Sequence, residues 1–166
     1  MRIAFRSLVA IVALIAMVSA AAPAQAHDKH SDITTVTVYH QPVTTTSVTG
    51  SGMDTVRTFF APTAVNGKAA DGQYLTGTLT TVTLGLPDNQ EVRASNLIFV
   101  FGSIDNQLVV GGASLYPSGA ATIAVGARVV RPVIGGSGTY AGAAGQVIST
   151  NLGESGWTHV FKIRLP

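Results

Sequence analysis

Alternation of apolar and polar residues, rather than any helical repeat, dominates the chain from residue 33 onward. In its clearest instance, residues 157–165, Trp157, His159 and Phe161 begin an apolar row that continues at every second position. Successive side chains of a strand point to opposite faces, so this row shares one face. No segment of this region keeps an apolar stripe at helical spacing for more than about two turns. The sequence therefore predicts β-structure and excludes a helical bundle.

Turn-forming residues divide this region into about eight β segments. Asn66-Gly67 and Asp71-Gly72 are predicted turns, and Asp105-Asn106 is predicted to join an apolar strand to its return strand, residues 107–116. The apolar run 121–134 is predicted as the strand that follows. Links of turn length between strands indicate antiparallel pairing.

We predict that residues 33–166 form one all-β domain, a small antiparallel eight-stranded β-barrel. A sandwich of two sheets satisfies the same pattern and is the alternative. The barrel is favoured because closure removes the exposed strand edges that Thr- and Val-rich segments would otherwise present.

Residues 1–26 have the three parts of an export signal. The start is positively charged, the run 8–18 is apolar and uncharged, and Ala24-Gln25-Ala26 is a small-x-small cleavage site. The apolar run is shorter than the ~20 residues of a membrane-spanning helix, although a retained N-terminal anchor is the alternative. We expect cleavage near Ala26, a flexible tail at 27–32, a secreted or periplasmic protein and no stable membrane insertion.

Charge and composition exclude several classes of partner. Loss of Arg2 and Arg6 with the signal would leave eight of the ten Lys and Arg residues against eight Asp and Glu residues. Without net charge or a basic stripe, a nucleic-acid partner is not expected. The chain has no cysteine, which excludes disulfides and thiolate chemistry. His27 and His30 lack further ligand residues nearby, so neither a metal site nor a cofactor is predicted.

The strongest motif is residues 131–147, RPVIGGSGTYAGAAGQV. It resembles the signature of the allene oxide cyclase and dirigent barrel family, an apolar strand end followed by Gly-Gly-Ser/Thr-Gly, an aromatic residue and Gly-Ala-x-Gly-x-Val. Residues 99–112 and 159–163 resemble the hairpin before this signature and the closing strand after it. Residues 136–141 formally fit a nucleotide-binding loop, but the helix that such a loop requires does not follow.

The resemblance implies an eight-stranded barrel, assembled as a homodimer or homotrimer, whose interior holds a small apolar ligand. Family cyclases close a fatty-acid epoxide, and dirigent proteins direct the coupling or ring closure of phenolic intermediates. It therefore implies a protein that steers the cyclisation or isomerisation of its ligand by confinement. The alternatives are a non-catalytic carrier of hydrophobic ligands and a structural or interaction barrel plugged by its own side chains. The sequence leaves open whether the protein is an enzyme; if it is one, an isomerase or cyclase is expected.

The chain departs from the family on its first strand. Family cyclases place a glutamate on an early strand, whereas residues 33–43 contain no acid. Dirigent proteins commonly show a Tyr-x-His-Asp-like patch there, and this chain has Tyr39-His40-Gln41. The amide of Gln41 cannot act as a general acid or base. These departures favour the carrier.

His159 and Tyr39 are the candidate catalytic residues. The ordinary pKa of histidine suits acid–base chemistry at neutral pH if the row of His159 faces the interior. A packed histidine bonded to a neighbouring strand is the alternative. Tyr39 and His40 point to opposite faces, so at most one of them faces inward.

Aromatic and arginine side chains are the candidates for ligand binding. Phe99 and Phe101 share a face and are predicted to line or fill the interior. Arg128 and Arg131 lie on opposite faces; either could hold a ligand carboxylate, with surface pairing as the alternative. The predicted ligand-binding residues are Phe99, Phe101, Tyr140, Trp157 and Arg128.

Overall fold

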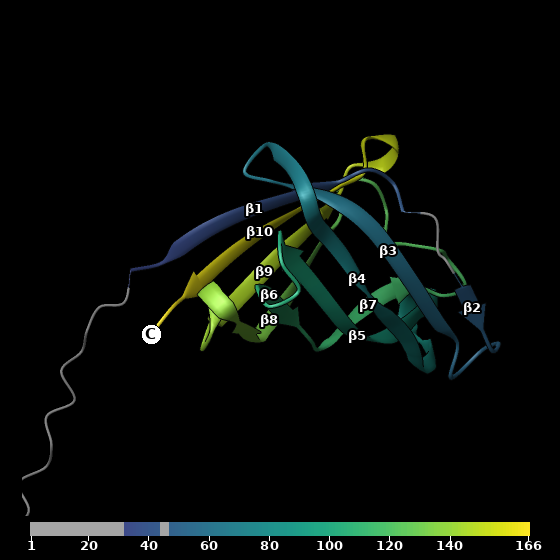
Figure 1. The fold of residues 1–166 in the computed structure, drawn as a ribbon. Coiled ribbons are helices and arrows are strands. Elements are labelled where there is room, and N and C mark those ends of the chain that lie inside the picture. Colours follow the sequence, from purple (N-terminus) through teal and green to yellow (C-terminus); the bar gives the residue numbers. More distant parts are fainter. Residues whose placement is uncertain (1–31, 44–46) are drawn as a thin grey trace, which may run out of the picture.

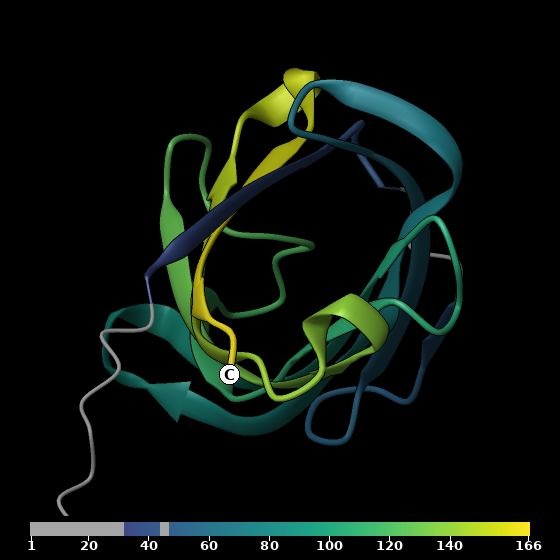
Figure 2. The same ribbon diagram turned by 60° about the vertical axis from the view of Figure 1, so that its left-hand side comes forward.

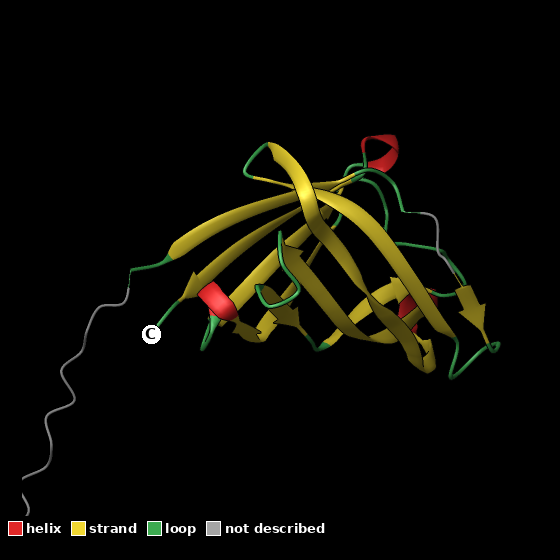
Figure 3. Cartoon of the chain, viewed as in Figure 1, coloured by secondary structure: helices red, strands yellow, loops and turns green. Residues whose placement is uncertain are grey.

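The computed structural model describes residues 32–43 and 47–166. The predicted signal, His27 and His30 lie outside these residues. The described chain consists almost entirely of strands with three short 3₁₀ turns (Figures 1 and 3), and it holds no helix that is long and apolar enough to cross a membrane. The strands are β1 (Thr34–His40), β2 (Ser47–Thr49), β3 (Val56–Val65), β4 (Lys68–Leu86), β5 (Gln90–Phe101), β6 (Gln107–Val110), β7 (Ala113–Pro117), β8 (Arg128–Ser137), β9 (Ala144–Asn151) and β10 (Trp157–Arg164). The 3₁₀ turns are η1 (Pro87–Asn89), η2 (Gly138–Tyr140) and η3 (Gly153–Ser155).

These strands form one antiparallel sheet that closes on itself. Its order is β1-β10-β9-β8-β6-β5-β4-β3-β2, and β1 also pairs with β3. Because β6 and β7 both pair with β5, they occupy a single position in the barrel, and β2 is a short addition beside β3. The described residues therefore form the predicted closed, antiparallel, eight-stranded barrel, seen as a ring in Figure 2.

Two predictions for the middle of the chain were wrong. The predicted strand 107–116 is broken at Gly111-Gly112, where Gly112 adopts a φ of +101° that favours glycine. The predicted strand 121–134 begins only at Arg128. Residues 118–127 instead form the connection between β7 and β8, which enters the ring of strands (Figure 2). Most residues of this connection are exposed, but Ile123 is buried against Tyr116 and Val129. The apolar composition of the connection resembles that of a strand, which explains the wrong prediction.

The two turns predicted between β3 and β4 have different outcomes. Asn66-Gly67 forms the hairpin turn, with φ of 48° and 80°, as a primed turn between twisted strands requires. Asp71-Gly72 lies within β4 and does not reverse the chain. The positive φ of Gly72, 72°, instead accompanies a hydrogen bond of 3.1 Å from the Gly102 amide to the Gly72 carbonyl.

The glycine-rich signature allows the connection between β8 and β9 to approach the turn after β5. A Cβ at Gly136 would overlap the backbone oxygen of Tyr140, and one at Gly138 would overlap the side chain of Asn106. The Oδ1 atom of Asn106 accepts a hydrogen bond of 3.0 Å from the Thr139 amide. The signature thus serves close packing at one end of the barrel.

The interior of the barrel has an apolar end and a polar end. On β5, Leu97 and Phe99 face the apolar core, whereas Glu91, Arg93 and Ser95 continue the same inward row into the polar end. The residues of the apolar core are Val36, Val38, Leu75, Leu97, Phe99, Leu108, Val110, Val133, Ala143, Val147, Phe161 and Ile163. This core closes one end of the barrel and leaves space at the other.

Candidate functional site

A cavity of about 560 Å³ occupies the polar end of the barrel and is called here the barrel cavity. Its apolar wall includes Leu75 and Leu97 of the core and Ile123 of the connection 118–127 between β7 and β8, which is called here the inserted connection. Its rim includes Val125, which is exposed, so the cavity reaches the surface. Its volume lies within the ~300–1,000 Å³ of small-molecule sites.

Strand register brings two histidines together in this cavity. On β1, β10 and β9, His40, Trp157 and Asn151 lie opposite one another, and the next inward residue of β10 is His159, which is opposite Ser149. The rings of His40 and His159 stack with centroids 5.0 Å apart and planes 24° apart. The indole of Trp157 is nearly parallel to His159 at 6.2 Å. The period of two in β10 therefore places an aromatic stack on the inner wall.

One ring nitrogen of His159 is free to meet a ligand. Its Nδ1 atom is 2.8 Å from the Ser149 hydroxyl, whereas Nε2 is buried and has no hydrogen-bond partner among the described residues. The side chain lines the cavity and is only 4% exposed. A buried nitrogen without a partner is costly unless a ligand or water completes it. The Nε2 atom of His159 is therefore the polar atom of the wall best placed to contact a ligand.

Both cavity histidines are held in the neutral form. Burial lowers the pKa of His159 well below its usual 6.5, and the charges of His40 and Arg131 lower it further. Burial also lowers the pKa of His40, although the hydrogen bond with the Gln41 carbonyl acts in the opposite direction. Neither histidine pairs with a carboxylate within residues 32–43 and 47–166. At neutral pH each ring can therefore donate or accept a proton.

Arg131 stands in the wall beside the histidines. It is 3% exposed, and its Nε and Nη2 atoms donate to the Ser95 hydroxyl and the Tyr116 hydroxyl, each over 2.8 Å. The alternation along β8 turns Arg131 inward and leaves Arg128 exposed on the outer face. Arg131 thus lines the cavity, and both of its side-chain hydrogen-bond partners are uncharged hydroxyls.

A second buried network holds the inserted connection. Glu91 accepts a bond of 2.6 Å from Nε of Arg93 and another of 3.1 Å from the Gly119 amide. Arg93 also lies 4.3 Å above the Tyr116 ring and donates to the carbonyl of Ala121 over 3.1 Å. Burial alone would raise the pKa of Glu91, but the Gly119 amide and Arg93 together lower it. This network fixes the connection that forms one wall of the barrel cavity.

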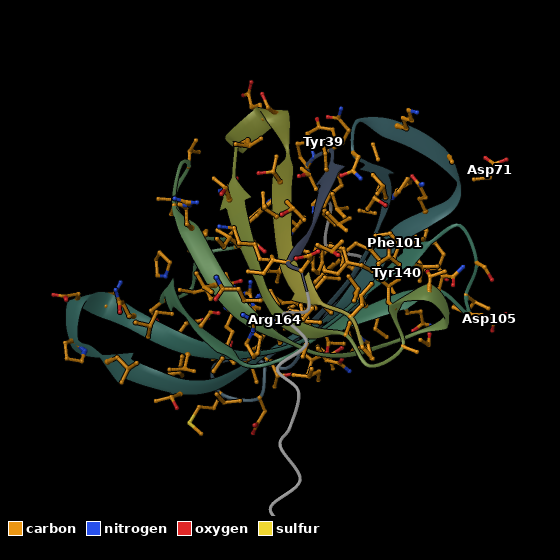
Figure 4. All side chains as sticks on the ribbon, turned by 90° about the vertical axis from the view of Figure 1, so that its left-hand side faces the viewer. Tyr39, Asp71, Phe101, Asp105, Tyr140 and Arg164 are labelled. Atoms are coloured by element: carbon orange, nitrogen blue, oxygen red, sulfur yellow. The ribbon has the colours of Figure 1, made fainter. Side chains whose placement is uncertain are left out.

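The structure brings together only part of the predicted site. His159 and Trp157 line the barrel cavity, and Phe99 lies in the core, with its ring edge to face against His159 at 5.0 Å. Phe101 and Tyr140 pack on each other at 4.5 Å away from the cavity lining (Figure 4). The remaining two predicted residues, half-buried Tyr39 and exposed Arg128, are not part of the lining.

Sequence reasoning missed the polar residues of β5 and β9. Glu91 and Arg93 continue the row of Phe99 at a period of two, and Ser149 and Asn151 continue that of Val147. Extending the inward row of each strand past its apolar part would have found them. The polarity of Glu91 and Arg93 made that end of β5 resemble a loop.

The free energy of unfolding is expected to fall as the pH drops below about 6.5. Because the histidine pKa values are lower in the folded state, the unfolded chain binds more protons, and stability decreases with falling pH. Each histidine can remove up to about 1.4 kcal/mol per pH unit. Urea denaturation between pH 7 and pH 5 measures this slope. His159→Phe should flatten it, and equal slopes in both proteins would contradict the assignment.

Comparison with known proteins identifies similar folds. No protein-family model matches the sequence, and no curated protein matches it. The structure is similar to a pyocyanin demethylase, at a TM-score of 0.55 and 19% identity over 80% of this chain and 99% of that chain. A Diels-Alderase from Streptomyces koyangensis is similar at 0.53 and 15% over 84% and 72% of the two chains. A pterocarpan synthase dirigent protein is similar at 0.53 and 13% over 86% and 92%. These similarities show a shared barrel fold.

Proposed function

We propose that this protein is an exported barrel that binds a small, mainly apolar molecule in the barrel cavity and steers its cyclisation or isomerisation. The observation that carries the proposal is the buried Nε2 atom of His159, which has no partner among the described residues and belongs to a side chain that lines a 560 Å³ cavity. The N-terminal signal pattern supports export.

The chemistry available in the cavity is confinement together with proton transfer by a histidine. Apolar walls select a folded conformer of the ligand and exclude water, while the rings of Trp157 and His40 offer stacking surfaces. A neutral His159 would donate or accept a proton at one ligand atom. Cyclisation and isomerisation rearrange bonds within one molecule, so they consume no second substrate.

Two similarities support this function. The glycine-rich signature resembles that of the allene oxide cyclase and dirigent barrels. Among the similar structures, a Diels-Alderase and a pterocarpan synthase dirigent protein carry names that denote ring-forming chemistry of small molecules.

A non-catalytic carrier is the second candidate, and a specific feature favours it. No carboxylate among the described residues orients either cavity histidine, and Glu91 is engaged by Arg93. Without such a partner, a histidine gains no added basicity from a neighbouring charge. A carrier would use the same cavity and release its ligand unchanged.

Native mass spectrometry of the mature protein, purified without detergent from its own source, tests the proposal. We expect a co-purifying apolar molecule, which extraction and mass analysis identify, and the same spectrum reports the oligomeric state. A clean apo mass that stays unchanged after challenge with lipids and phenolic compounds would contradict the proposal.

Turnover of the identified molecule then separates the enzyme from the carrier. His159→Phe should retain the fold and reduce turnover about 10²–10⁴-fold, as expected for loss of a general acid or base. Thr158→Val changes the adjacent residue, which points to the outer face of β10, and should leave turnover unchanged. Binding without conversion by the wild-type protein identifies the carrier.

A further inference from the structure

Arg131 is a buried cation that lacks an anionic partner. Its two hydrogen-bond partners, the hydroxyls of Ser95 and Tyr116, are neutral. No carboxylate lies within ion-pair distance of it in the part of the chain that the structure describes. A buried charge is expensive to desolvate unless an opposite charge compensates it. Because Arg131 lines the barrel cavity, a ligand inside the cavity can supply that charge.

The nearest buried carboxylate is already used. Glu91 bonds to Arg93 over 2.6 Å, and its Oε1 atom lies 4.0 Å from Arg57, which also lines the cavity. Glu154 is part of the cavity rim but is exposed in η3 and forms no ion pair with Arg131. Arg57 and Arg93 thus share the buried Glu91, and Arg131 is left as a buried cation of the cavity wall without an ion-pair partner among the described residues.

His159 supplies a second group on the same wall. His159 lies opposite Ser149 and Ser149 opposite Val129, and Arg131 is the next inward residue of β8 after Val129. A Ser149 hydroxyl that donates to Nδ1 leaves the hydrogen on Nε2, which then acts as a donor. The guanidinium and this N–H would converge on one oxyanion, since both line the same cavity.

We propose that the ligand carries a carboxylate, which pairs with Arg131 and accepts a hydrogen bond from Nε2 of His159, while its apolar body lies against Trp157 and Ile123. This inference rests on the proposed function, because it specifies the chemical class of the molecule that the cavity holds. The protein is therefore selective for an acid over a neutral molecule of the same shape.

Matched probes test this selectivity on the unmodified protein. Calorimetry at pH 7 would measure the affinity for decanoic acid against 1-decanol, and for 2-naphthoic acid against 2-naphthalenemethanol. A hydrogen-bonded charge pair in a buried site predicts that the acid of a pair binds about ten- to a hundredfold more tightly than its alcohol. Equal affinities overturn this inference alone. Binding of neither member of either pair overturns the inference together with the proposed function.

Variants locate the source of the preference. Arg131→Met should bring the affinities for acid and alcohol within about threefold of each other, with the alcohol bound as before. Arg164→Met removes the same charge from the exposed outer face of β10 (labelled in Figure 4) and should preserve the selectivity. If Arg131→Met fails to fold, His159→Phe should still reduce the acid preference. A preference that survives in both cavity variants overturns the inference.

Discussion

Glu91→Gln is expected to lower the free energy of unfolding by about 3 to 5 kcal/mol, because it breaks a buried ion pair from one side. The guanidinium of Arg93 is fully buried, and Glu91 is its only anionic partner among the described residues. The amide keeps the shape and an acceptor oxygen but removes the charge. Urea denaturation at pH 7 measures the loss.

The pH dependence of this difference provides an internal check. The pKa of Glu91 is lower in the folded state than its ordinary value, so its contribution to stability is present above about pH 4.5 and is lost as the pH falls through the folded pKa. The wild-type protein and Glu91→Gln should therefore approach each other in stability at acidic pH.

Glu154→Gln is the matched control, since it removes a carboxylate that is exposed in η3. We expect this variant to change the unfolding free energy by less than about 0.5 kcal/mol. A loss below about 1 kcal/mol in Glu91→Gln would mean that the carbonyl groups of residues 120 and 121 suffice to hold Arg93.

Phe99→Ala is expected to cost about 3 to 5 kcal/mol, as large-to-small changes at fully buried aromatic residues do. Phe99 is 1% exposed and meets the rings of Phe161 and His159 edge to face, at 4.9 and 5.0 Å. Its removal leaves a void beneath His159, at the boundary between the apolar core and the barrel cavity. The midpoint of urea denaturation measures the change.

Phe60→Ala is the control for this prediction. Phe60 is 50% exposed and packs on Tyr74 at 5.1 Å, so truncation should cost less than about 1.5 kcal/mol. Similar losses in the two variants would contradict the assignment of Phe99 to the central core.

The sequence determined the fold class because its signals are local. The alternation through Trp157, His159 and Phe161 specifies which residues of β10 share a face, whatever that strand pairs with. The Asn66-Gly67 pair specifies a tight hairpin, since its residues accept the positive φ that a primed turn needs. The alternation also established that Tyr39 and His40, and likewise Arg128 and Arg131, point in opposite directions.

Only the tertiary structure decided which of those directions is inward. On β8 valine occurs on both faces, so hydrophobicity does not distinguish them. The register with β9 turns Arg131 toward the cavity, and the register of β1 with β10 does the same for His40. The inserted connection 118–127 was missed because contacts distant in sequence hold it in place: Arg93 donates to the Ala121 carbonyl, and Asn151 donates to the Ile123 carbonyl. Local pattern encodes alternation, whereas the inner face of a barrel, and with it the site, depends on closure between strands far apart in the chain.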